Sequence, residues 1–222
     1  MVKQAPGPVG TGRTLEEGKC QVPQDNTLHP RLHAVERELA AATTRAARLV
    51  DQVDEAGFRR RPEPGHWSIA ECLGHLNLTT VAYLPLIDEV LQIGRLLPRG
   101  SRRSMRRDFT GWLLCLIAEP PYRRRASTTA QFIPDRMGSR ADVLAEFVRL
   151  QQELTSRVYR AEGLDLTSLV IVSPFDGRLR YHLYSCFRVL PTHQRRHLWQ
   201  AEQVLSRLWQ TGPNPEMRIA EA

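Results

Sequence analysis

Residues 29–53, HPRLHAVERELAAATTRAARLVDQV, carry the pattern that decides the fold class. The stretch is rich in Ala, Leu, Glu and Arg, all of which favour helices. Its apolar residues recur at spacings of three and four; they are Leu32, Val35, Leu39, Ala42, Ala46 and Leu49. The pattern predicts an amphipathic helix whose apolar face must pack against other helices.

A second long helix is expected after Ser68. Ser68 and Glu71 stand three residues apart, the spacing of a capping box at a helix start. The apolar face that follows predicts a helix running through Pro85, with a kink, to about Leu91. Residues 57–67, which contain two prolines, are expected to form the loop before it.

Two further long helices are predicted in the second half of the chain. Ser139 is a typical N-cap before the apolar stripe of residues 141–160. The last helix covers about residues 183–209, with a bend expected at Pro191, and the glycine and prolines at 212–215 end it.

The connection between the second and third long helices is long and irregular. Residues 94–140 lack a helical period and are expected to hold one short apolar helix at 112–118. Residues 164–179 predict a loop with an extended piece. Four long helices without an alternating strand pattern predict an all-α four-helix bundle with extra short helices.

A single bundle domain at residues 29–210 accounts for most of the chain. Residues 1–28 have no apolar core of a signal peptide and are expected to form a disordered leader, and residues 211–222 a flexible tail. No apolar run approaches the ~20 residues that a membrane-spanning helix needs, so no membrane partner is expected.

The four cysteines are widely spaced and include no Cys-x-x-Cys pair; they are Cys20, Cys72, Cys115 and Cys186. This spacing indicates neither a zinc ribbon nor a thioredoxin-type motif. It favours a reduced, cytoplasmic location.

The formal charge of +7 raises the question of a nucleic-acid partner. The arginines concentrate at 95–107, 123–125 and 195–196, mostly in expected loops, and the motifs of known nucleic-acid modules are missing. We interpret these clusters as a solvated surface, with a substrate anion as the alternative ligand. Arg195 and Arg196 are expected to point away from any metal.

Histidines provide the main candidate chemistry. His193 and His197 are one helical turn apart, so their side chains lie on one face and could share a metal ion. His75 is the single histidine of the second helix, and a lone histidine there is often a core residue. Gln200 follows on the flank of the pair, where its amide could support a ligand or bind substrate.

Glu71 has three candidate roles. It could complete the capping box, accept a hydrogen bond from a ligand imidazole one turn away, or act as a general base. The residue pattern alone leaves these alternatives open.

Two blocks of sequence resemble the DinB-like superfamily of metal-binding four-helix bundles. Residues 67–76, WSIAECLGHL, are similar to the family's Trp-x-x-x-Glu-x-x-x-His-Leu helix start, and residues 193–201, HQRRHLWQA, to its His-x-x-x-His-x-x-Gln last helix. The resemblance implies that His75, His193 and His197 are the ligands of a divalent ion. In this family the ion is zinc, nickel or iron.

The resemblance also implies a range of activities. Members act as thiol S-transferases or thiol-dependent isomerases with low-molecular-weight thiols, and some are described as hydrolases. Three neutral imidazoles leave an open coordination position, as catalytic sites require. We therefore predict a metal-dependent S-transferase or hydrolase with a small-molecule substrate, with a homodimer as a further expectation. The alternatives are a non-catalytic helical binding module and, third, nucleic-acid binding through the arginine-rich loops.

Overall fold

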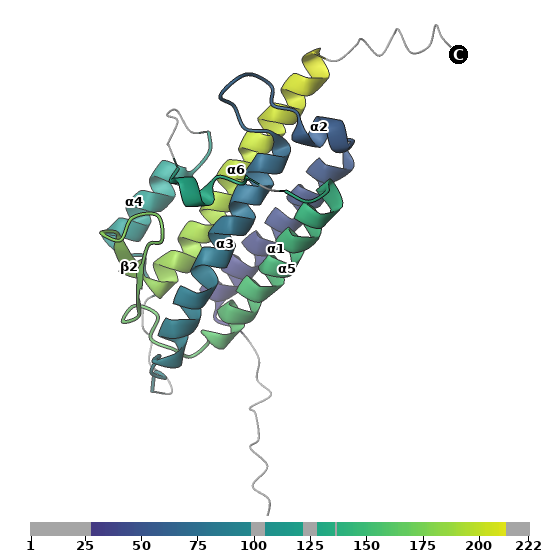
Figure 1. Cartoon of the computed structure of the whole chain (residues 1–222). Coiled ribbons are helices and arrows are strands. Elements are labelled where there is room, and N and C mark those ends of the chain that lie inside the picture. Colours follow the sequence, from purple (N-terminus) through teal and green to yellow (C-terminus); the bar gives the residue numbers. More distant parts are fainter. Residues whose placement is uncertain (1–27, 99–104, 122–127, 136, 212–222) are drawn as a thin grey trace, which may run out of the picture.

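The computed structural model describes residues 28–98, 105–121, 128–135 and 137–211. Four long helices run alongside one another (Figure 1); they are α1 (Pro30–Asp51), α3 (Ile69–Gln92), α5 (Arg140–Arg160) and α6 (Leu183–Thr211). Each of α1 and α3 packs against both α5 and α6. The predicted all-α bundle is thereby confirmed.

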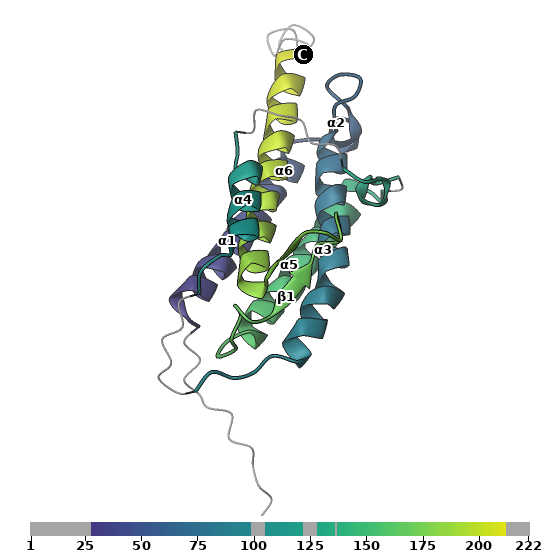
Figure 2. The same ribbon diagram turned by 90° about the vertical axis from the view of Figure 1, so that its left-hand side faces the viewer.

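Short elements lie in the connections between the long helices; they are α2 (Glu55–Arg59), α4 (Phe109–Ala118), the 3-10 helix η1 (Ala130–Phe132), and strands β1 (Val170–Val172) and β2 (Arg180–His182). The strands pair antiparallel, with Ile171 opposite Tyr181. Helix α4 lies beside α6 in both views (Figures 1 and 2). The long connection from α3 to α5 thus contains α4 and η1 and places them along one side of the bundle.

Helix α2 departs from the expected secondary structure. Residues 57–67 were expected to form a loop, yet the first three of them belong to α2, which ends at Arg59. The Asp54 side chain accepts a hydrogen bond from the Gly57 backbone N–H at 2.7 Å, and Phe58 is completely buried in the core. Burial of one large aromatic side chain stabilises this single turn.

The predicted capping box at Ser68 and the predicted N-cap at Ser139 are both present, and Ser139 also forms a capping box. The Ser68 hydroxyl accepts from the Glu71 backbone N–H while the Glu71 carboxylate accepts from the Ser68 backbone N–H. Ser139 and Asp142 repeat the arrangement at the start of α5. Pro85 and Pro191 lie inside α3 and α6, which continue through them.

The core follows the predicted apolar stripes. All six apolar residues identified in the first helix are buried, as are Cys72, Cys115 and Cys186, which are free thiols. In the described part of the chain, no helix combines the length and apolar content required to cross a bilayer. The predicted leader (1–28) and tail (211–222) fall, apart from Leu28 and Thr211, outside the described residues.

Candidate metal centre

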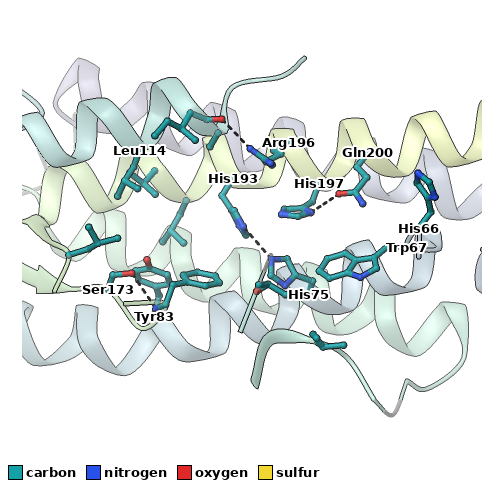
Figure 3. A pocket seen from close by; sticks show the side chains of 18 of the residues that line it. His66, Trp67, His75, Tyr83, Leu114, Ser173, His193, Arg196, His197 and Gln200 are labelled. Carbon is teal, nitrogen blue, oxygen red and sulfur yellow. Dashed lines mark hydrogen bonds between the residues drawn. The ribbon is translucent and has the colours of Figure 1, made fainter. Parts of the chain in front are cut away.

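Three imidazoles from two adjacent helices converge on one point. His75 projects from α3, and His193 and His197 project from α6 one turn apart (Figure 3). One ring nitrogen from each lies within 4.8 Å of the others, so the three histidines could hold a metal ion. His75 is only 1% exposed, which places the group inside the bundle rather than on its surface.

Hydrogen bonds to the outer ring nitrogens orient two of the imidazoles. His75 Nδ1 lies 2.8 Å from the Phe132 carbonyl oxygen, which can only accept, so this nitrogen carries the proton. His197 Nδ1 lies 3.1 Å from the Gln200 Oε1. In both rings the Nε2 lone pair is thereby free to point at the centre, as in metal sites whose ligands are held by an outer hydrogen bond.

The Nε2 atoms of His75 and His193 lie 3.3 Å apart. Two nitrogen lone pairs at that distance repel unless a proton or a cation stands between them. Nitrogens bound tetrahedrally to zinc at ~2.0–2.1 Å are themselves separated by about 3.3 Å. The spacing therefore fits a shared ion.

Burial holds the three imidazoles in the neutral form that a metal requires. Desolvation lowers the pKa of His193 to about 3, and the neighbouring His75 and Arg196 act in the same direction. Desolvation, followed by His193 and His75, holds the pKa of His197 well below its usual value. The pKa of His75 is also lowered by burial, against the opposing hydrogen bond to Phe132.

A buried amide pair sets the rotation of α6. Gln194 lies between the two α6 ligands and exchanges hydrogen bonds of 2.9 and 3.1 Å with Gln151 of α5. Both side chains are almost fully buried. Because each amide satisfies the other, turning α6 would leave polar groups unpaired, and this keeps His193 and His197 facing α3.

A cavity of about 530 Å³ opens on the three histidines. Its walls are mainly apolar and come from α4, α6, the β1–β2 hairpin and the chain after η1; they include Leu114, Ile117, Ile133, Phe175, Leu179 and Val189. Tyr83 and Ser173 also line it (Figure 3). The Tyr83 hydroxyl is hydrogen-bonded to that of Tyr181. This volume is in the range of small-molecule sites.

Comparison with known proteins identifies the family of the chain. The sequence model of the DinB superfamily matches residues 38–201. The chain belongs to the DinB superfamily. No curated protein and no solved structure gives a significant match. The matched range contains all three histidines and both helices that carry them.

Glu71 serves the helix start of this DinB-superfamily bundle rather than the histidines. Its carboxylate accepts from the Ser68 backbone N–H at 2.8 Å and from Arg61 Nε at 2.9 Å. Burial opposes ionisation, but the hydrogen bonds from Arg61 and Ser68 outweigh it and lower the pKa of Glu71. Of the roles considered for Glu71, the structure shows the capping box, and His75 Nδ1 pairs with the Phe132 carbonyl.

Arg196 was expected to point away from any metal, and in the structure it forms part of the cavity wall. It is 8% exposed, lines the cavity, and donates from Nη1 to the Ile117 carbonyl at 3.1 Å. Residues three apart share a helix face, so Arg196 follows His193 toward the cavity. Arg195 does point away, and it pairs with Glu38 and Glu119.

Two aromatic residues have roles that the sequence pattern did not indicate. The Trp67 ring stacks on His197 at 5.8 Å between centroids and contacts His75 at 4.9 Å. Phe132 lies in the irregular connection, where no periodic signal could identify it as the partner of His75. His182, at the end of β2, contacts Asp108 instead of joining the metal ligands.

Proposed function

We propose that this DinB-superfamily protein is a metal-dependent enzyme of the thiol S-transferase or hydrolase kind. The observation that carries the proposal is the cavity that opens directly onto three convergent, neutral imidazoles. Structural metal sites are closed by four protein ligands, whereas a three-ligand site facing a cavity leaves one position for a small molecule.

Zinc, nickel and iron all suit three imidazole ligands. Such an ion would supply Lewis-acid activation, lowering the pKa of a thiol or water molecule that enters the open position. The candidate co-substrate is a low-molecular-weight thiol. The free, buried thiols of Cys72, Cys115 and Cys186 fit the reducing cytoplasm in which such thiols are abundant.

The chain's own residues would orient the metal ligands and form the cavity that binds the substrate. Phe132 and Gln200 hold two imidazoles in the required tautomer. The apolar cavity wall excludes water from the electrophilic substrate, which must lie within reach of the activated sulfur or oxygen. Arg196 places a positive charge at the wall, where it would favour an anionic substrate group.

Metal content tests the first half of the proposal. Protein purified without a histidine tag should contain about one equivalent of a transition metal, and added zinc or nickel should raise its melting temperature. His193→Ala should lose both properties. His33→Ala removes a histidine that is half exposed on α1, outside the site, and should behave as the parent protein.

A transition-metal content below a tenth of an equivalent, with no thermal response to zinc or nickel, would rule out the metal site. Activity tests the second half, using low-molecular-weight thiols with a panel of electrophiles and a panel of ester and amide substrates. Retained metal without turnover in either panel would instead favour the non-catalytic binding module.

A further inference from the structure

The outer face of α4 is apolar although it faces solvent. Five side chains on this ten-residue helix are between 37% and 73% exposed; they are Phe109, Trp112, Leu113, Leu116 and Ile117, here called the outer stripe. Their spacing of three and four places them on one helix face. A stripe with this spacing normally faces a core or a partner.

The opposite face of α4 is already used for packing. Gly111 lies so close to α6 that an added Cβ would stand 2.2 Å from the Ser185 Cβ, and Cys115 is buried. Helix α4 is therefore apolar on both sides, and the bundle accounts for only one of them. A contiguous exposed apolar surface of this kind marks an interaction site.

A basic hollow adjoins the stripe at the start of α4. It has a volume of about 400 Å³ and is lined by Arg31, Arg106, Arg107 and Asp108 together with Phe109 and Trp112 of the stripe. The three arginines are exposed. The single carboxylate, Asp108, caps α4 by accepting from the Gly111 N–H at 2.7 Å, and it also accepts from the His182 backbone N–H. The hollow keeps a net positive charge.

We propose that the outer stripe and the basic hollow dock this protein on a membrane surface that contains anionic phospholipids. Apolar side chains including a tryptophan would enter the headgroup boundary, and the arginines would meet lipid phosphates. This is a peripheral contact that needs no spanning helix. It rests on α4 and the segment before it and is independent of the metal site.

The area of the stripe favours a lipid surface over a second copy of the chain. The five exposed side chains offer roughly 500 Å², whereas a stable protein interface needs about 800 Å² from each partner. A nucleic acid would fit the arginines but not the adjoining apolar stripe. Since Ile117 belongs both to the stripe and to the wall of the cavity, docking would set the cavity beside the lipid.

Vesicle co-sedimentation of the full chain tests this proposal. Binding is expected to vesicles made of equal parts phosphatidylcholine and phosphatidylglycerol, and not to pure phosphatidylcholine. Trp112→Ser should weaken binding by about tenfold or more, because it removes inserted apolar area. The matched control is Trp209→Ser, which removes a tryptophan 62% exposed on α6 and should leave binding unchanged.

A second pair of variants tests the hollow. Arg106→Gln combined with Arg107→Gln should weaken binding by about 25-fold, or about fivefold per arginine. Arg37→Gln combined with Arg48→Gln makes the same change in net charge at exposed positions of α1 and should leave binding nearly unchanged. Circular dichroism and the melting temperature establish that each variant is folded, and Leu116→Gln replaces Trp112→Ser if that variant is not.

Three outcomes would overturn the proposal. The first is a parent protein that ignores anionic vesicles, and the second is an equal loss of binding in both arginine pairs. The third is a parent protein that binds no vesicles but sediments as a dimer, when Trp112→Ser converts that dimer to a monomer. This result would assign the stripe to a second copy of the chain.

Discussion

Lowering the pH should destabilise the protein through His193, and this loss should begin at pH values well above those at which carboxylates titrate. Burial lowers the pKa of His193 to about 3, against about 6.5 for a histidine in the unfolded chain. At pH values between these two pKa values, His193 binds a proton in the unfolded state and not in the folded state. Stability is therefore fully present above the unfolded pKa and is lost as the pH falls toward the folded one.

The size of the effect follows from the shift. From pH 7 to pH 5, His193 alone, with its pKa of about 3, should reduce the free energy of unfolding by about 2 kcal/mol. His75 and His197 act in the same direction because their pKa values are also lowered. The carboxylates with a lowered pKa, such as Glu71, keep their contribution above pH 5 and do not obscure the result.

Urea unfolding of chelator-treated protein at pH 7 and pH 5 measures this difference. The variant His193→Gln cannot be protonated, so its pH dependence should be shallower by up to about 1.4 kcal/mol per pH unit. Equal stability of the parent at both pH values, or an unchanged pH dependence in His193→Gln, would refute the reasoning.

Three further predictions concern the capping box at the start of α3, the hydrogen bond that supports His197, and the packing of α4 against α6. Glu71→Ala should lower the free energy of unfolding by about 1–3 kcal/mol, because Arg61 and the Ser68 N–H lose their acceptor. Urea titration measures this loss, and metal analysis should find the metal content unchanged. Gln200→Ala should weaken metal affinity by about 10- to 100-fold in a competition titration with a chelating dye, because His197 loses its outer hydrogen bond. Gly111→Ala should lower the free energy of unfolding by about 1–3 kcal/mol through the clash with Ser185, whereas Gly177→Ala, which meets open space, should have little effect on the thermal midpoint.

Local sequence signals accounted for most of the secondary structure. Helix periodicity and capping depend on residues three and four positions apart, so α1, α3, α5 and α6 could be predicted within a few residues of their ends. The turn α2 escaped prediction because its stability comes from the burial of Phe58, which a five-residue window cannot reveal. The β1–β2 hairpin is similarly short, and only an extended piece was expected there.

The site divides in the same way. The spacing of His193 and His197 is a local feature of one helix, and the sequence alone placed both on one face. The tertiary structure decided that His75, 118 residues away, meets His193 and that the carbonyl of Phe132, 57 residues from His75, holds its ring. It also turned Arg196 toward the cavity and assigned Glu71 to the helix start. Those contacts depend on how separate segments pack, and no periodicity within a single segment encodes that packing.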